Sequence, residues 1–444
     1  MSGSVRRSEV GSRSKAAAIR EMLVAKQGGR VSLSGEALPP EMQQALLPGT
    51  PLGGSMRSAA GGGGGDEGGG KWLSPAKDMA GSWTIMKSSW LNVLLVAVPL
   101  GLVSEHAGWS PSVTFLLNLA ALVPLALLLG CVTEDLSLRL GQIVGGLLNA
   151  TFGNVVEIIL SIAALQKGLY QVVATSLLGS VLSNMLMVLG MSFVCGGIKY
   201  RILRFNSLAS QSSVSLLLLS AISIVLPTAA LHLSMGGAAE EHLSSESVLL
   251  MSRMTAVALL VVYAGYLFFQ LGSHSDLFGG PEEEDEEGGG SMLSLGAASL
   301  WLGGITVLVA ACSEALTGSI EEVSHVWGLS QSFLGFIVLP IAGNACEHIT
   351  AVFVAMKDKM DLSMGIAIGS SIQIGLLAVP LVTIVGWATG HPFSLAFDPF
   401  SALVLVLSVI HTAVMISDAE SNWLEGLQLL VTYFIIAVAY ALTT

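Results

Sequence analysis

The sequence predicts an all-α polytopic membrane protein with about eleven transmembrane helices. Of its 444 residues, 52% are hydrophobic and only 11% are charged, and the mean hydropathy is +0.74. Soluble proteins carry about 25% charged residues, so this composition is typical of a chain that crosses a membrane many times. The apolar stretches lack the alternation of a transmembrane barrel. Because lipid cannot satisfy backbone polar groups, such stretches must be helices.

A long N-terminal region precedes the apolar stretches. Residues 1–89 contain 11 of the 19 Lys and Arg residues, together with a glycine-rich run at 61–70. This composition predicts a flexible basic tail without a core of its own. The piece from Lys15 to Lys26 has helical composition and an apolar side, so it either docks on the membrane or the transporter body, or stays disordered.

Eleven apolar spans follow, each with roughly the 20 residues that a helix needs to cross the hydrocarbon layer. Their approximate limits are 90–108, 112–132, 141–166, 170–194, 212–230, 250–272, 297–318, 331–357, 364–390, 398–416 and 422–443. After the first span (90–108), residues 109–272 and 297–444 form two five-span halves. The linker between them, 273–296, carries the acidic run Glu282–Glu287. This run is either a solvated linker or an anionic patch that concentrates divalent cations near a pore entrance.

Positive charges predict the orientation, because cytosolic loops are enriched in Lys and Arg. With the N-terminal region in the cytosol, alternate loops place only Lys167 and Arg253 on the opposite side. The N-terminus is therefore expected in the cytosol and the C-terminus across the membrane.

The two halves share a repeated motif. Gly153-Asn154-Val155-Val156-Glu157 recurs 190 residues later as Gly343-Asn344-Ala345-Cys346-Glu347, and the same offset relates Gly179-Ser180 to Gly369-Ser370. An odd number of spans, five, separates the two motifs, so their helices run in opposite directions. Inverted repeats of this kind are typical of secondary transporters, whose ions bind near the midplane where the halves meet.

The motif residues predict a cation site. A glutamate within a membrane span is a functional-site candidate by default, and Asn154 with Glu157, like Asn344 with Glu347, shares one helix face. Carboxylate and amide oxygens suit a hard cation, and two glutamates balance one divalent ion. Polar helix–helix adhesion is the structural alternative, but it does not require a glutamate in both copies.

Several further polar residues could support this site. Ser180 with Asn184, and Ser370 with Gln373, lie on neighbouring spans at one-face spacing, although adhesion explains them as well. His348 is a proton relay or a structural histidine. Glu314, one turn inside the seventh span, is a candidate for an ion pathway or gate. Cys346 and His348 beside Glu347 would permit softer ions such as Mn²⁺.

These stretches resemble the Ca²⁺/H⁺ (cation/proton) exchangers of the cation/Ca²⁺ exchanger superfamily, and most closely the vacuolar exchangers of fungi, algae and plants. The resemblance covers roughly residues 90–444 and is carried by the sequences at 145–165, 177–190, 333–348 and 357–377. It implies an extra first helix followed by two inverted five-helix repeats. It also implies a central cation site at Asn154, Glu157, Asn344 and Glu347.

The expected function is therefore an antiporter, not an enzyme, that exchanges cytosolic Ca²⁺ for protons across a vacuolar or other acidic-organelle membrane. Ca²⁺ and H⁺ are its substrates, Mn²⁺ is an alternative cation, and neither a cofactor nor a nucleic-acid partner is expected. Oligomeric state and stoichiometry stay open. The alternatives are a cation channel, a sodium/calcium-type exchanger, and an intramembrane protease with paired carboxylates. The protease is disfavoured because the motifs contain Glu instead of Asp.

Overall fold

The computed structural model describes residues 73–232, 245–275 and 291–443, apart from the side chains of residues 142, 143 and 443. The predicted helical piece Lys15–Lys26 and the acidic run Glu282–Glu287 lie outside the described residues. The end of the predicted flexible tail is described and is helical, because α3 spans Pro75–Met86 and buries Asp78, Gly81 and Ile85. The prediction of a structureless tail up to residue 89 is therefore wrong for this segment.

The described chain is almost entirely helical, as predicted. The elements from the first span to the linker are η1 (Trp90–Val96), α4 (Ala97–His106), α5 (Pro111–Phe152), α6 (Val155–Gln166), α7 (Tyr170–Leu182), η2 (Ser183–Val188), α8 (Leu189–Lys199), β1 (Leu203–Arg204), α9 (Ser207–His232), α10 (Ser245–Phe268) and η3 (Phe269–Ser273). After the linker come α12 (Leu295–Trp327), α13 (Gln331–Phe333), η4 (Leu334–Val338), α14 (Leu339–Gly343), α15 (Ala345–Ala355), α16 (Met360–Gln373), η5 (Ile374–Ala378), α17 (Val379–Thr389), α18 (Pro399–Met415), β2 (Glu420–Ser421) and α19 (Trp423–Thr443).

Within the described residues, seven helices are long and apolar enough to cross a membrane, and up to ten if each of three bent helix pairs is one span. The helix α18, in the tenth predicted range, is apolar but shorter. Every one of the eleven predicted ranges contains helix. The polytopic helical fold is thus confirmed, whereas the count of eleven crossings stays a prediction.

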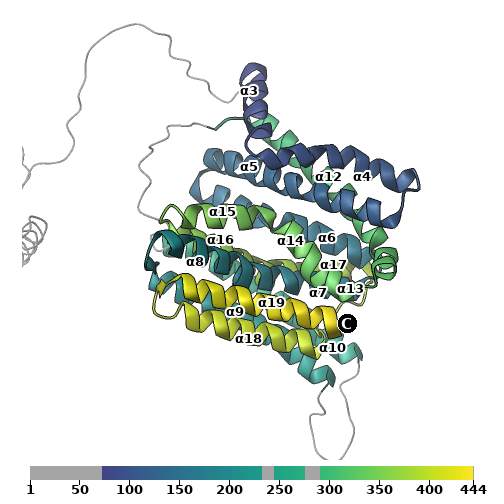
Figure 1. Cartoon of the computed structure of the whole chain (residues 1–444), viewed down its shortest axis with the longest axis vertical. Helices are drawn as coiled ribbons and strands as arrows, with labels where there is room; N and C mark the ends of the chain where they lie inside the picture. Colours follow the sequence, from purple (N-terminus) through teal and green to yellow (C-terminus); the bar gives the residue numbers. More distant parts are fainter. Residues whose placement is uncertain (1–72, 233–244, 276–290, 444) are drawn as a thin grey trace, which may run out of the picture. The chain divides into compact units, whose positions relative to one another are not determined.

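Helices from the two halves pack against each other throughout the bundle. Helices α4, α5 and α12 lie together in one layer, in the upper part of Figure 1, with α5 against α12. In the rest of the bundle α18 packs on α9, α19 on α8, and α17 on α10. The α7–η2–α8 helix is the most buried of the long spans, with 89% of its apolar window inside the protein, followed by the α16–η5–α17 helix at 61%. The apolar windows of these two helices therefore lie largely inside the protein.

Helix irregularities recur at the repeat offset. Asn154 interrupts the helix between α5 and α6, and Asn344, 190 residues later, interrupts it between α14 and α15. The π-helical segment η2 ends at Val188 and η5 ends at Ala378, again 190 residues apart. The two halves therefore share their helix breaks as well as their sequence motif.

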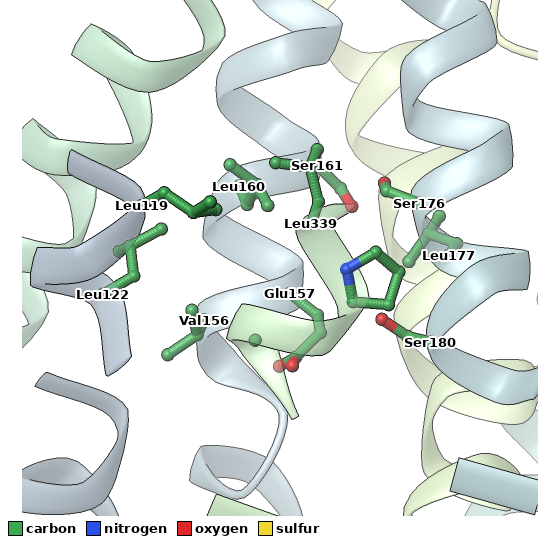
Figure 2. Close-up of a pocket in the computed structure, with 12 residues that line it drawn as sticks. Leu119, Leu122, Val156, Glu157, Leu160, Ser161, Ser176, Leu177, Ser180 and Leu339 are labelled. Atoms are coloured by element: carbon green, nitrogen blue, oxygen red, sulfur yellow. The ribbon is translucent and has the colours of Figure 1, made fainter. Parts of the chain in front are cut away.

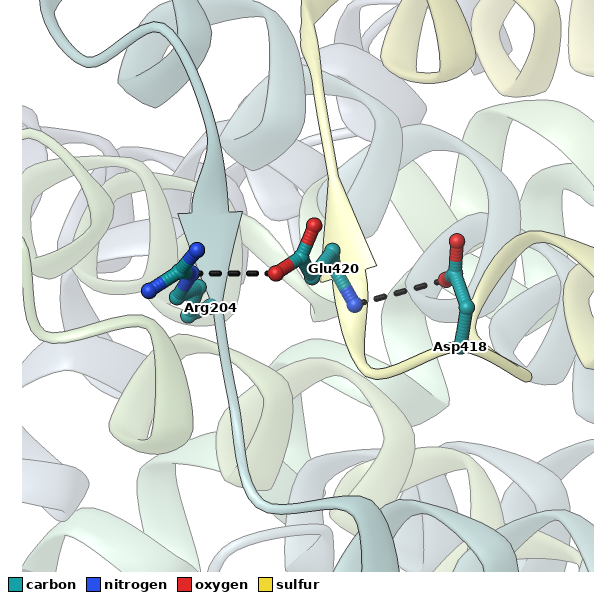
Figure 3. A network of polar contacts seen from close by, with 3 residues as sticks. All are labelled: Arg204, Asp418 and Glu420. Carbon is teal, nitrogen blue, oxygen red and sulfur yellow. Dashed lines mark hydrogen bonds and ion pairs between the residues drawn. The ribbon is translucent and has the colours of Figure 1, made fainter.

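A short two-stranded sheet also joins the halves. Strand β1 pairs antiparallel with β2, and Arg204 Nε lies 3.0 Å from Glu420 Oε1 (Figure 3). The backbone N–H of Glu420 donates to Asp418 Oδ1 at 3.3 Å. Both side chains of the ion pair are solvent-exposed, so the pair contributes little to stability and mainly marks where the loops meet.

Candidate cation site

Each Gly-Asn-x-x-Glu motif lies at a bend in a broken helix. The bend is 44° between Val144–Phe152 and α6, and 54° between Gln331–Gly343 and α15. Both asparagines have non-helical backbone angles, and each glutamate lies in the first turn of the helix that follows. In the second motif helix the break follows Pro340, a residue that removes one backbone hydrogen bond from a helix. The first helix breaks at the same place without a proline, so the proline is not required.

The two asparagines each use their amide N–H groups to bind the opposite half. Asn154 Nδ2 donates to Gln373 Oε1 at 2.5 Å, and Asn344 Nδ2 donates to the backbone carbonyl of Ser180 at 3.3 Å. Because only the NH₂ group of an amide can donate, these bonds fix the orientation of each asparagine side chain. Both amide oxygens are thereby left available as acceptors.

Four buried oxygens of the motif residues lack a hydrogen-bond partner within the described part of the chain: Asn154 Oδ1, Asn344 Oδ1, Glu157 Oε2 and Glu347 Oε2. Asn154, Asn344 and Glu157 are at most 6% exposed. Buried polar atoms are nearly always paired, since an unpaired one costs on the order of 1–3 kcal/mol. Four unpaired acceptors, two of them on carboxylates, are the donor set that a hard divalent cation takes.

Glu157 of the first half reaches the second motif across the interface between the halves. A β-carbon built on Gly343 would lie 2.8 Å from Glu157 Oε1, so the carboxylate of the first half rests directly on the backbone of the second motif. Glycine at 343 is thus required for this close approach.

A small cavity opens beside Glu157 (Figure 2). Its volume is about 10 Å³, room for about one water-sized particle. Glu157, Ser161, Ser176 and Ser180 supply its polar groups, and leucines of α5 and α6 line the other side. One dehydrated ion, not a larger solute, fits such a space.

The supporting residues are placed unevenly around this centre. Ser180 lines the cavity, Gln373 is bound to Asn154, and Ser370 is half-buried on α16 one turn before Gln373. Asn184 is fully buried in η2, and both polar atoms of its amide lack a partner among the described residues. The π-helical turns at η2 and η5 carry or adjoin these groups, and such turns often occur at functional sites.

His348 is engaged on both ring nitrogens. Its Nδ1 donates to the carbonyl of Asn344 at 2.5 Å, and its Nε2 lies 3.4 Å from Ser183 Oγ. Because a carbonyl only accepts, Nδ1 carries the proton and Nε2 accepts from Ser183 when the ring is neutral. This arrangement is the one expected of a structural histidine. Ser183 itself was not singled out from the sequence.

Glu314 and Cys346 point elsewhere. Glu314 is exposed on α12 and does not line the cavity, while its backbone carbonyl accepts from Lys167 Nζ at 2.6 Å. The Cys346 sulfur lies 3.7 Å from the β-carbon position of Gly130, on α5. The structure therefore places Glu314 away from the cavity and the Cys346 sulfur against α5.

A sequence profile of the family described as "Sodium/calcium exchanger protein" matches residues 110–272 and 297–442. The chain belongs to this family. Among its curated relatives, a "Vacuolar calcium ion transporter" of Schizosaccharomyces pombe is 40% identical over 80% of this chain and 86% of the relative. A "Ca(2+)/H(+) antiporter" of Synechocystis is 42% identical over 80% of this chain and 97% of the relative. "Vacuolar cation/proton exchanger 2" of Arabidopsis thaliana is 41% identical over 79% of this chain and 80% of the relative.

Solved structures agree with this family membership. The structure described as native YfkE superposes with a TM-score of 0.67 and 33% identity, covering 79% of this chain and 99% of that one. The structure of an "H+/Ca2+ Exchanger CAX" superposes with a TM-score of 0.59 over 82% of this chain and 93% of that one. At 13% identity, the second likeness concerns the fold alone.

Proposed function

We propose that this family member is an antiporter that exchanges cytosolic Ca²⁺ for protons from an acidic compartment. The observation that carries the proposal is the set of four unpaired buried oxygens at Asn154, Glu157, Asn344 and Glu347, two of them on carboxylates. The choice of Ca²⁺ and H⁺ as the exchanged ions, and of the vacuolar membrane as the location, is supported by the names of the curated relatives, which are Ca²⁺/H⁺ antiporters and vacuolar cation/proton exchangers.

Charge balance couples the two ions. An uncompensated carboxylate is strongly penalised in a low-dielectric interior, so two buried glutamates need either a divalent cation or protons. A carboxylate that holds a proton cannot also supply a full charge to Ca²⁺. Binding of one ion therefore expels the other, which is the requirement for exchange without leak.

The asparagines act as fixed neutral ligands. Because Asn154 is held by Gln373 and Asn344 by the Ser180 carbonyl, each amide oxygen is oriented before the ion arrives. Each of these bonds crosses between the halves. A change in the relative position of the halves would alter both amides together and so alter the affinity for the cation on the two sides of the membrane.

The proposed orientation has the N-terminus in the cytosol, on the distribution of Lys and Arg residues. Two inverted five-helix repeats are the proposed layout, supported by the shared offset of motifs and helix breaks. Mn²⁺ is a candidate second substrate, because amide and carboxylate oxygens also suit that ion. No cofactor takes part in this mechanism.

The direct test is radioactive Ca²⁺ uptake into sealed vesicles with an acidic interior. The Glu157→Gln and Glu347→Gln variants are each expected to abolish uptake, since glutamine keeps the size but removes the titratable charge. Glu314→Gln is the matched control and should transport normally. Normal uptake by either motif variant, with the protein folded, would refute the two-glutamate site.

The same vesicle assay distinguishes two other transport modes from proton-driven exchange. A sodium/calcium-type exchanger would drive uptake with an internal Na⁺ load in place of acid. A channel would equilibrate Ca²⁺ without any ion gradient and would continue after an ionophore collapses the proton gradient. Proton-driven uptake that stops with the ionophore is the result expected here.

A further inference from the structure

The helix α3 binds the segment that leads into α12. Asp78, on the inner side of α3, accepts from the backbone N–H of Ser294 at 2.6 Å and from the Ser294 hydroxyl at 2.8 Å. It also accepts from the N–H of Ser74 at 2.7 Å. Ser294 is the N-cap of α12, where its hydroxyl oxygen accepts from Ala297 N–H at 3.3 Å. Asp78 therefore holds the capping residue and places a negative charge at the positive end of α12.

A second carboxylate holds the two preceding residues. Asp135, 3% exposed on α5, accepts from the backbone N–H of Met292 through Oδ1 and from that of Leu293 through Oδ2, the latter at 3.1 Å. Three consecutive N–H groups, at residues 292, 293 and 294, are thus bound by carboxylates from two other helices. We call Asp78, Asp135 and residues 292–294 the clasp.

Close packing surrounds these bonds. A β-carbon built on Gly81 of α3 would lie 2.5 Å from the carbonyl oxygen of Met292, so the two backbones touch. Trp301 Nε1, on α12, donates to Ser82 Oγ at 2.9 Å. These contacts from α3 extend the attachment from the clasp into the first turns of α12.

The clasp joins the helix that forms one wall of the candidate site, and none of the clasp residues is itself a candidate ligand, although α12 packs on α6 and α5 on α15. Leu119 and Leu122, on the same continuous part of α5 as Asp135, line the cavity beside Glu157. Helix α12 packs along α5, so the clasp fixes both helices at one end. The ion ligands lie on or beside α6 and α15, which the clasp residues do not contact in the described hydrogen bonds.

We propose that Asp78 and Asp135 are positioning residues that make α3, the first part of α5 and the start of α12 one rigid group. Any movement of Leu119 and Leu122 relative to Glu157 then carries α3 and the start of α12 with it. Loosening the clasp uncouples these helices and slows turnover, while the ligands and their affinity for Ca²⁺ are unchanged. The inference rests on the proposed exchange activity for its kinetic part only.

The test uses Asp78→Asn, Asp135→Asn and the milder Ser294→Ala in the full-length protein reconstituted in vesicles. Proton-driven Ca²⁺ uptake is expected to show a maximal rate that is several-fold lower, with KM for Ca²⁺ unchanged. Asp361→Asn is the matched control, because Asp361 is exposed and its carboxylate also accepts a backbone N–H, that of Asn206, away from the clasp. This control should keep the wild-type rate and KM.

Hydrogen–deuterium exchange in nanodiscs measures the clasp independently of transport. Exchange should accelerate by about tenfold at residue 294 in Asp78→Asn and at 292–293 in Asp135→Asn, since charged acceptors make the stronger bonds. Unchanged exchange at these amides refutes the clasp. A KM that rises with the fall in rate, an equal loss in Asp361→Asn, or a normal rate despite faster amide exchange refutes the positioning role. A wild-type protein that protects 292–294 but shows no proton-driven uptake refutes the proposed exchange instead.

Discussion

Replacing Gly343 by alanine tests the contact between the halves at the candidate site. The added methyl group would lie 2.8 Å from Glu157 Oε1, whereas ordinary contacts begin at 3.4 Å, so the carboxylate must retreat by 0.6 Å. Ca²⁺–oxygen distances vary only over roughly 2.3–2.6 Å, so a shift of this size away from a bound ion would break the ligand bond. With an effective dielectric constant of about 20, moving one carboxylate from about 2.4 to about 3.0 Å from a divalent ion costs about 3 kcal/mol, or about a hundredfold in affinity.

The assay is Ca²⁺ binding to the purified variant by isothermal titration calorimetry, beside thermal unfolding. Gly365→Ala is the matched control, because a β-carbon at Gly365 meets nothing within 4 Å and lies in a helix of the same half. The control should bind Ca²⁺ normally and gain slightly in stability, as alanine is the better helix former. Wild-type Ca²⁺ affinity in Gly343→Ala would refute the geometry of the site, since the carboxylate could then move without consequence.

Three further predictions follow from other contacts. Asn344→Ala removes one neutral ligand and should weaken Ca²⁺ binding by about tenfold. The fully buried amide of Asn118 donates to the backbone carbonyls of Gly101 and Thr114. Asn118→Ala should therefore lower thermal stability but leave Ca²⁺ affinity intact, and equal affinity losses in both variants would contradict the assignment. Gly179→Ala places a β-carbon against the Phe336 carbonyl oxygen and should destabilise the protein by roughly 1–3 kcal/mol, measured as a lower Tm. Gly304→Ala is the control, because a β-carbon there meets open space, and its Tm should not fall. An unchanged Tm in Gly179→Ala would contradict the packing. Burial raises the pKa of Asp78, but its bonds from the backbone and side chain of Ser294 and from the Ser74 backbone outweigh this and hold the pKa below 3.8. The ionised Asp78 carboxylate therefore stabilises the fold above that pH. The Tm difference between wild type and Asp78→Asn should be constant down to about pH 5 and shrink only as the pH falls through the pKa of the folded state. A Tm difference that vanishes near neutral pH would contradict this.

The repeated motif predicted the centre of the candidate site. An Asn and a Glu within an apolar span can satisfy their polar atoms only against other polar groups, so two copies at a fixed offset were expected to meet where the halves pack. The structure adds the contacts that the spacing did not predict, Gln373 on Asn154 and the Ser180 carbonyl on Asn344. The helical fold was equally predictable, because hydrocarbon permits little else.

Other features left no local signal in the sequence. The sequence could not predict which way the Glu314 side chain faces. It lies on α12, a helix of 33 residues whose hydrophobic periodicity does not distinguish a face that lines an ion pathway from a face that points outward. The π-helical turns at η2 and η5 have no sequence signature. Asp78, Asp135 and residues 292–294 come from three distant parts of the chain, so only tertiary structure brings them together. Asp78 had accordingly been assigned to a structureless tail.

The most direct measurement of the central claim is proton release on Ca²⁺ binding. Purified protein in weakly buffered detergent solution would be titrated with Ca²⁺ while a pH indicator records released protons, for wild type and for the Glu157→Gln, Glu347→Gln double variant. If the two glutamates hold either ion, wild-type protein releases protons in proportion to Ca²⁺ bound, and the double variant neither binds Ca²⁺ nor releases protons. Ca²⁺ binding without proton release in the wild type, or undiminished binding in the double variant, would contradict the account.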